Sequence, residues 1–271
     1  MTMKILLTND DGVYSLGIQT LARKLTEKGH EVLVVAPDRE RSGCGHAMTL
    51  DRPLNLQKVD SFLLGSTYTT YSCDGTPTDC VILALDALKF IPDFIFSGIN
   101  QGLNLGDDLT YSGTACAAME GVLYGFPSIA ISLAANLKCQ NIYNYTAAEV
   151  AIAILDWLEL HPLPEGVMLN VNIPNLPLKE LKGVSLTRTG KRLYKDKVRV
   201  VEAPTGEKAY WIGGTAENDL THGTDVWAVF NGYASITPVH LDMTCYETYD
   251  ECDGLGAERA LVDQLNKIIH N

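Results

Sequence analysis

Short apolar segments alternate with amphipathic ones at the start of the chain. Residues 4–8 and 31–36 are apolar runs of strand length, and between them apolar residues recur at helical spacing from Ile18 to Leu25, after a candidate cap at Ser15. Strands that are apolar at every position are buried on both faces of a sheet. The pattern predicts a β-α-β unit that begins a doubly wound parallel sheet.

The same alternation continues as far as Pro174. Residues 48–58 and 67–73 predict short strands or a hairpin, and residues 93–96, 127–133 and 168–173 predict further strands. Helices are predicted at residues 76–89, 113–124 and 146–160. The helix at 76–89 has the clearest start, because Thr76 is a good N-cap, Pro77 fits the first turn and Asp79 is an acid in that turn. Repeated β/α alternation predicts an α/β fold with a largely parallel sheet.

Beyond Pro174 the pattern changes to short alternating segments. Residues 184–189 and 210–213, and the pair 226–230 and 234–239 around Asn231-Gly232, predict antiparallel strands, and residues 254–270 predict a closing amphipathic helix. We therefore interpret residues 1–271 as a single domain. It has a core at residues 1–175 and a hairpin arm with a C-terminal helix at residues 176–271, which packs on the core or on a partner subunit.

Composition and charge narrow the class of protein. With 46% hydrophobic and 20% charged residues, the chain has the composition of an ordinary globular protein. Its formal net charge of −12 argues against binding to a nucleic-acid polymer. No apolar run reaches 18 residues and no leader segment is evident, so neither a membrane span nor secretion is expected. Seven cysteines without a CxxC pair suit a reducing compartment, and we expect a cytoplasmic protein.

Polar residues follow the predicted parallel strands, at the edge where open sheets bind ligands. They lie in three loops: Asn9, Asp10 and Asp11 after the first strand, residues 38–49 after the second, and residues 97–106 after the strand at 93–96. Considered on its own, the acidic pair could belong to a solvated turn, and Ser42 or Asn100 could be an ordinary turn residue. Together, adjacent carboxylates and neutral oxygen donors favour Mg²⁺ or Mn²⁺ over zinc, since no histidines have metal-binding spacing.

A second candidate feature is the start of the helix at residues 113–124. Ser112, Gly113 and Thr114 open a helix of small residues whose free amide groups could bind an anion, although ordinary capping by Ser112 is an equal alternative. His46 could donate a proton or could be a local hydrogen-bonding group. Cys44 has no evident base beside it, which argues against a thiol nucleophile.

Five motifs in order resemble the SurE family of metal-dependent nucleotide phosphatases. They are NDDG (9–12), APDRERSG (36–43), DGTPTDCV (74–81), SGINQGLNLGDD (97–108) and YSGTACAAMEG (111–121), with weaker likeness at YASITP (233–238) and 242–244. The resemblance implies a Rossmann-like domain, an oligomer with an exchanged C-terminal arm, and hydrolysis of nucleoside monophosphates. The loop Cys44-Gly45-His46-Ala47 departs from the serines that many members carry, which puts substrate contacts by those hydroxyls in doubt.

The resulting hypothesis is a phosphomonoesterase of the 5'-nucleotidase type, active as a homodimer or homotetramer with one divalent ion per subunit. The predicted metal ligands, which match the family's positions, are Asp10, Asp11, Ser42 and Asn100. Of these, Asp10, Asp11 and Asn100 are the predicted catalytic residues. Phosphate contacts are predicted from Asn9, Gly43, Asn104, Ser112, Gly113 and Thr114. Activity on 3'-nucleotides or polyphosphate is left open, as are the preferred base and the general acid.

Two rival classes fit less well. A receiver-type signalling module also has paired acids after its first strand, but it needs a further Asp after its third strand and about half this length. A nucleotide-sugar transferase lobe is suggested by GHEVLVVAP at residues 29–37, but it requires a second Rossmann lobe that the chain after Pro174 does not supply.

Overall fold

The structure is a computed structural model that describes residues 1–60, 67–135, 139–195, 198–246 and 264–266. The chain divides into two units, Met1–Val239 and His240–Asn271. Within the second unit, residues 264–266 are helical, and the rest of the helix predicted at 254–270 lies outside the described residues. The fold and the site described below belong to the first unit.

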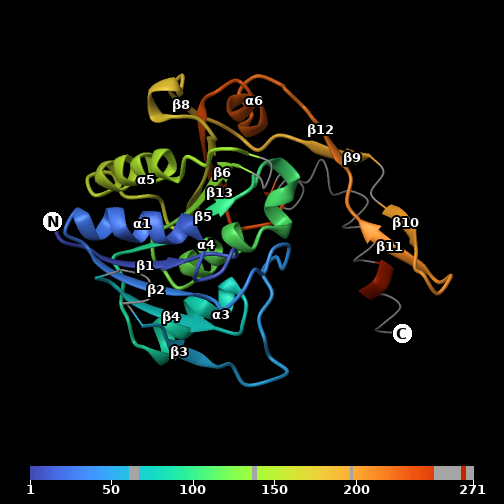
Figure 1. The fold of residues 1–271 in the computed structure, drawn as a ribbon. Coiled ribbons are helices and arrows are strands. Elements are labelled where there is room, and N and C mark those ends of the chain that lie inside the picture. The colour runs from blue at the N-terminus through green and yellow to red at the C-terminus, as the bar shows by residue number, and fades with distance from the viewer. Residues whose placement is uncertain (61–66, 136–138, 196–197, 247–263, 267–271) are drawn as a thin grey trace. The chain divides into compact units, whose positions relative to one another are not determined.

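Its described residues form one large sheet with the strand order β3-β4-β2-β1-β5-β6-β7-β13-β8 (Figure 1). These strands are β1 (Lys4–Thr8), β2 (Glu31–Pro37), β3 (Leu56–Lys58), β4 (Thr69–Cys73), β5 (Phe94–Gln101), β6 (Ser128–Ala134), β7 (Val167–Pro174), β8 (Val184–Leu186) and β13 (Ala234–His240). The six strands from β4 to β7 in this order are parallel to one another, β3 is an antiparallel edge strand, and β13 runs parallel to β8. The predicted doubly wound α/β fold is confirmed.

Helices cover both faces of this sheet (Figure 1). One face carries α1 (Leu16–Glu27) and α5 (Asn144–Leu158), and the other carries α3 (Pro77–Ile82), which continues as a π-helical turn (Leu83–Ala87), and α4 (Gly113–Leu123). Strand periodicity directs alternate side chains to the two faces, so Ile5 and Leu7 of β1 lie in the core beneath α1, and Leu6 lies in the core beneath α3. Each β1 residue from Ile5 to Leu7 is fully buried, which explains the continuous apolar pattern.

The strand predicted at 93–96 is longer than expected. β5 continues through Ser97 to Gln101, a stretch that its glycine and asparagine content assigned to a loop. The pairing of β5 with β6 shifts register between Ser97 and Asn100. Gly98 lies there at φ +134°, and a Cβ on it would lie 2.3 Å from the carbonyl oxygen of Ile131, so only glycine fits this close approach. The strand predicted at 48–58 is instead limited to β3.

The hairpin predicted at residues 226–239 is wrong in its first half. Residues 225–230 form helix α6 (Asp225–Phe230), which begins at Thr224, whose hydroxyl accepts a hydrogen bond from the Trp227 N–H at 3.1 Å. Asn231 ends this helix and Gly232 follows at φ +87°, so Asn-Gly acts here as a helix stop rather than a hairpin turn.

The predicted antiparallel arm is present between residues 192 and 218. Strand β9 (Arg192–Lys195) pairs with β12 (Thr215–Asn218), and β10 (Val198–Glu202) pairs with β11 (Lys208–Ile212), both antiparallel. The antiparallel pairing predicted for residues 184–189 and 234–239 is wrong, because β8 and β13 lie in the main sheet and run parallel to each other. In the portion of the chain described, no helix combines the length and apolar character needed to cross a bilayer.

Candidate active site

The loops after β1 and β2 are joined at the carboxyl edge of the sheet. The Arg41 N–H donates to the Asp10 carbonyl oxygen at 2.7 Å, and the Val13 N–H donates to the Pro37 carbonyl oxygen at 2.8 Å. Gly12, at φ +95°, allows this contact, because a Cβ on it would lie 3.1 Å from the backbone of Arg39. The two loops that sequence spacing predicted to meet do meet.

Asp10 lies beneath the first turn of α4. Its side chain is 4% exposed, and burial raises the pKa of its carboxyl group above the usual range. The Thr114 hydroxyl donates to Asp10 Oδ1. A Cβ on Gly113 would lie 3.2 Å from Asp10 Oδ2 and 3.0 Å from Asp10 Cβ, so a glycine at this position lets the helix end reach the carboxylate.

Asp11 is coupled to Asp10 and to the end of β5. Burial, and then the charge of Asp10, raises the pKa of Asp11 from 3.8 to about 6. Its Oδ2 accepts the Gln101 N–H at 3.0 Å. Glu40 adds negative charge near both aspartates. Among the described residues, no lysine or arginine side chain pairs with Asp10 or Asp11, so these acids lack a positive partner and suit a bound cation.

The two uncharged candidate metal ligands, Asn100 and Ser42, differ in whether their oxygen is available to bind an ion. Asn100 is 8% exposed, and its Nδ2 donates to the Gly102 carbonyl oxygen at 3.1 Å, which leaves Oδ1 available as a ligand. Ser42 follows Arg41, which is bonded to Asp10, but Ser42 is exposed and its hydroxyl donates to Glu40 Oε1 at 2.8 Å. It would have to leave Glu40 to bind a metal ion.

The donor set fits a hard divalent ion. Nowhere in the described ranges do three His, Cys, Asp or Glu side chains cluster as a metal site would require, so a cation at Asp10 and Asp11 depends on neutral oxygens as well. The Asn100 side-chain oxygen is suited to that role. Two carboxylates with amide and hydroxyl oxygens are ligands that Mg²⁺ and Mn²⁺ accept.

Two of the predicted phosphate-binding residues at the start of α4, Ser112 and Thr114, already make hydrogen bonds within the protein. Ser112 Oγ accepts the Ala115 N–H at 3.0 Å, so the capping alternative is confirmed. The Thr114 hydroxyl is bonded to Asp10, as described above. Gly43 has φ +72°, and a Cβ on it would have no atom within 4 Å, so it lies in an open part of its loop.

Asn9 has a buried side chain that braces the loop after β1. Its Nδ2 donates to the Gly12 carbonyl oxygen at 3.0 Å and to Ser15 Oγ at 2.8 Å, so Ser15 makes this bond and no cap bond to α1. Asn9 Oδ1 is buried without a hydrogen-bond partner in the structure. The contact of Asn9 with phosphate stays a prediction.

Asn104 lies in a network of buried amides that sequence analysis missed. Its N–H donates to Asn172 Oδ1 at 2.9 Å, and its Nδ2 donates to Ser132 Oγ at 2.7 Å. Its carbonyl oxygen accepts from Asn170 Nδ2 at 2.8 Å and Asn172 Nδ2 at 3.0 Å. The available signal was the pair Asn170 and Asn172, two residues apart on one face of an otherwise apolar strand.

His46 and Cys44 occupy the loop that departs from the family pattern. His46 Nε2 lies 2.8 Å from Oε2 of Glu120, a residue of α4 with 8% exposure, which matches the local hydrogen-bonding alternative. Burial, and then Asp10, raises the pKa of the Cys44 thiol. A raised pKa supports the view that Cys44 is not a nucleophile.

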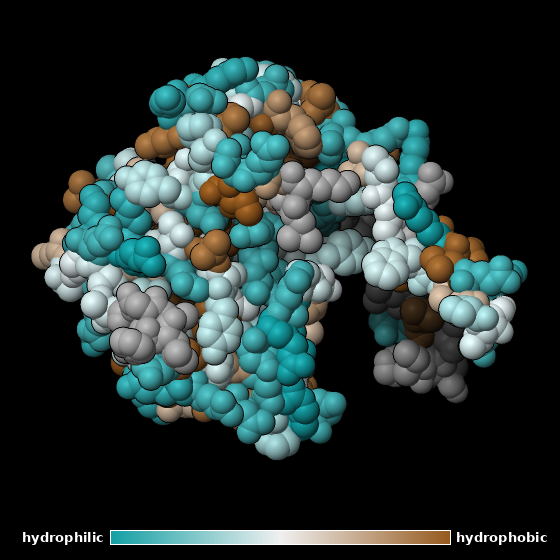
Figure 2. Space-filling model, viewed as in Figure 1, coloured by the Kyte–Doolittle hydropathy of each residue, from teal (hydrophilic) through white to brown (hydrophobic). Residues whose placement is uncertain are grey.

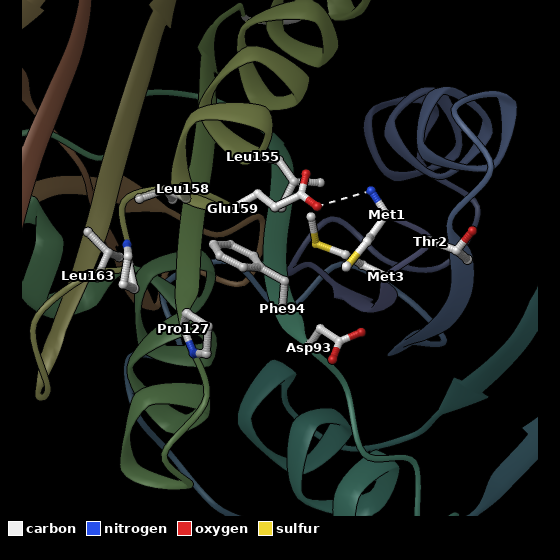
Figure 3. A pocket seen from close by; sticks show the side chains of 11 residues that line it. Met1, Thr2, Met3, Asp93, Phe94, Pro127, Leu155, Leu158, Glu159 and Leu163 are labelled. Atoms are coloured by element: carbon white, nitrogen blue, oxygen red, sulfur yellow. Dashed lines mark hydrogen bonds and ion pairs between the residues drawn. The ribbon is translucent and has the colours of Figure 1, made fainter.

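A cavity of about 300 Å³ lies at the opposite edge of the sheet (Figure 3). Met3, Phe94, Leu155 and Leu158 give it apolar walls, and the terminal amine of Met1 pairs with Glu159 at 3.0 Å. These residues lie at the amino ends of β1 and β5 and the end of α5. Open parallel sheets bind ligands at the other edge, so this cavity is not the candidate active site.

Comparisons with known proteins point to one family. Residues 5–196 match the family model described as Survival protein SurE. A protein named 5'-nucleotidase SurE from Stenotrophomonas maltophilia (strain R551-3) is 45% identical over 97% of this chain and 99% of its own length. A protein of the same name from Legionella pneumophila (strain Corby) is 46% identical over 93% of this chain and 97% of its own. The crystal structure of the SurE protein from Aquifex aeolicus superposes with a TM-score of 0.78 at 44% identity, over 93% of this chain and 99% of that one. The chain therefore belongs to the SurE family.

Proposed function

We propose that this protein is a metal-dependent 5'-nucleotidase that hydrolyses nucleoside monophosphates to nucleoside and phosphate. The observation that carries the proposal is a pair of adjacent acids without a cationic partner among the described residues. Asp10 is buried beneath the N-terminus of α4, and Asp11 is partly buried beside the end of β5. Relatives that match nearly the whole chain bear the name 5'-nucleotidase SurE. Neither a receiver module nor a transferase lobe is favoured by these relatives.

The acidic pair and Asn100 would hold one Mg²⁺ or Mn²⁺ ion per subunit, with Ser42 as a fourth ligand. Such an ion lowers the pKa of the attacking water and offsets negative charge on the phosphate. Thr114 holds Asp10 in place, and the Gln101 N–H holds Asp11. Both bonds fix the carboxylates before substrate arrives.

The first turn of α4 would bind the phosphate oxygens. A helix start attracts anions, and the Gly113 N–H is the proposed donor there, because the Ala115 N–H is bonded to Ser112 Oγ and the Thr114 N–H to Asp10. Gly113 also places no side chain between this helix start and Asp10. Asn104, fixed by its amide network, is positioned as a further contact. Asn9 and Gly43 complete the proposed set from the loops after β1 and β2.

Self-association as a homodimer or homotetramer is part of the proposal. Apolar side chains on the hairpin of β10 and β11 are exposed, including Val198 at 55%, Val200 at 60% and Ile212 at 85% (Figure 2). A two-stranded hairpin with so much apolar surface is covered in stable proteins by another surface. A second copy of the chain is the proposed cover.

A phosphate-release assay tests the activity. The panel is nucleoside 5'- and 3'-monophosphates, ribose 5-phosphate and polyphosphate, each with chelator, Mg²⁺ or Mn²⁺. We expect turnover of 5'-monophosphates only with a divalent ion, and its loss in Asp10→Asn and Asp11→Asn. Asp51→Asn, which removes an exposed carboxylate elsewhere, is the matched control. Full turnover after exhaustive chelation would overturn the metal mechanism, and equal rates on every ester would overturn the nucleotide assignment.

A further inference from the structure

A second cavity lies beside the proposed phosphate site and has no role in the function described so far. Its volume is about 480 Å³, within the range of small-molecule sites. It lies between the 3₁₀-helix Gly106–Tyr111 (η2) and the base of the hairpin arm. The lining residues are Asp108, Tyr111, Tyr194, Ile212, Gly213 and Gly214.

The cavity begins one residue before the N-cap of α4. Tyr111 directly precedes Ser112, the N-cap of that helix, and Gly113 contacts Asp10. The Tyr111 carbonyl oxygen also accepts the Gly45 N–H at 3.1 Å, which ties this point to the loop after β2. The cavity therefore lies next to the helix start at which the phosphate is proposed to bind.

The lining combines flat aromatic groups with one acceptor. The Tyr111 side chain is 69% exposed, so its ring is available for stacking. The Tyr194 hydroxyl donates to Asp108 Oδ2, and the Arg192 guanidinium lies 5.6 Å from the centre of the Tyr194 ring, so that ring is fixed. Arg192 also bonds to Asp108 Oδ2, which leaves Asp108 Oδ1 to accept an N–H group.

The wall on the arm side is anchored to the body of the protein. Asp225, which is fully buried, accepts the Gly106 N–H at 2.8 Å and the Gly190 N–H at 2.7 Å. A Cβ on Gly106 would lie 2.6 Å from the Gly190 carbonyl oxygen, so the two segments are in contact. The 3₁₀-helix that lines the cavity is therefore held at its first residue against the segment that leads into β9, and Gly213 and Gly214 place no side chain on the arm side.

We propose that this cavity binds the base and ribose of the nucleoside monophosphate, with the base stacked on Tyr111 beside Tyr194. The inference rests on the proposed function, because it takes the phosphate to lie at the start of α4. Aromatic side chains stack on any base, and a purine offers the larger surface. Asp108 accepts an amino or imino N–H of the base. A sugar phosphate without a base leaves the cavity unfilled.

Substrate selectivity is the first test. The ratio of kcat/KM for AMP to kcat/KM for ribose 5-phosphate is measured for the wild type, Tyr111→Ala and Tyr111→Phe. We expect Tyr111→Ala to lower this ratio by about 10-fold, in line with the loss of one base stack, and Tyr111→Phe to keep it. Tyr145→Ala, which removes an exposed tyrosine on α5 that lines none of this cavity, is the matched control. An unchanged ratio in Tyr111→Ala would overturn the inference.

Direct binding of adenosine is the second test, and it needs no turnover. Adenosine and ribose are titrated into the metal-free protein by calorimetry. Intrinsic tryptophan fluorescence provides a second signal, because the Trp211 ring would lie 3.6 Å from a Cβ on Gly213. We expect adenosine to bind the wild type and Tyr111→Phe, to bind Tyr111→Ala about 10-fold more weakly, and ribose not to bind. Equal adenosine affinity in all three proteins would contradict the inference.

The two proposals fail in different ways. If the wild type hydrolyses AMP but Tyr111→Ala changes neither selectivity nor adenosine affinity, the cavity is not the base site and the nucleotidase proposal stands. If the wild type hydrolyses no nucleotide under any metal condition, the nucleotidase proposal fails. In that case adenosine binding that depends on Tyr111 still supports a nucleoside site in this cavity, and its absence overturns it.

Discussion

Replacing Asp11 with asparagine should make the metal-free protein more stable at neutral pH. In the folded protein, burial and the charge of Asp10 raise the pKa of Asp11 from 3.8 to about 6. Each pKa unit corresponds to about 1.4 kcal/mol, so ionised Asp11 lowers the free energy of unfolding by up to about 3 kcal/mol. Asparagine removes that charge and keeps an oxygen that can accept the Gln101 N–H.

Because the pKa of Asp11 is higher in the folded protein than in the unfolded chain, its effect on stability develops over a defined pH range. Well below pH 4, Asp11 is protonated in both the folded and the unfolded chain, so it has no effect on stability. Between pH 4 and pH 6 the unfolded chain loses this proton before the folded protein does, so wild-type stability falls as pH rises. The metal-free wild type and Asp11→Asn should therefore have similar stability near pH 4, and the variant should be the more stable protein above pH 6.

Thermal unfolding with chelator, at several pH values between 4 and 8, measures this difference. For a protein of this size, 1 kcal/mol shifts Tm by about 2–4 °C, so the variant should melt up to about 10 °C higher at pH 7.5. Because Asp11 is only partly buried, this value is an upper limit. Asp51→Asn, which removes an exposed charge, should melt like the wild type at each pH.

Added metal should remove most of this difference in stability. A divalent ion at a hundredfold excess over its Kd stabilises a protein that binds it by about 2.7 kcal/mol. The wild type should gain that stabilisation with Mn²⁺, and Asp11→Asn should gain little. The reasoning would be refuted if the two metal-free proteins had the same pH dependence, or if Asp11→Asn melted lower than the wild type at pH 7.5. Equal metal-induced shifts would refute the assignment of Asp11 as a ligand.

Three further predictions concern the site and the arm. Thr114→Val, which removes the buried hydroxyl bonded to Asp10, should lower the free energy of unfolding by about 1–3 kcal/mol in urea denaturation and weaken Mn²⁺ binding. Gly113→Ala places a methyl group 2.9 Å from Cys44 Sγ and 3.0 Å from Asp10 Cβ, so calorimetry should show weaker metal binding while circular dichroism shows an intact fold. Val200→Glu on the exposed face of the hairpin should shift sedimentation toward a smaller species, and an unchanged species would show that this surface is not the contact between copies.

Local sequence signals were sufficient to predict many of the strands and helix starts of the core. The apolar runs at β1 and β2 predicted strands that the structure confirms. Each strand is buried on both faces, and such burial requires apolar residues at consecutive positions, which can be seen in the sequence. The helix start at Thr76 was predicted from residue types, and the structure shows the capping box, with Thr76 and Asp79 each accepting from the other's backbone N–H. The same holds for the capping of α4 by Ser112.

Only the tertiary structure decided what these elements touch. Asn231-Gly232 suits a hairpin turn as well as a helix stop, and the outcome depends on the cap at Thr224 and on β13 joining the main sheet. The bond from Thr114 to Asp10 joins residues 104 positions apart, and the bond from the Asn104 N–H to Asn172 joins residues 68 apart. The sequence by itself determined which residues follow the strands, because those signals are local. The order of the strands and the packing of α4 determined which of those residues meet, because such contacts form only when distant segments are brought together by the sheet.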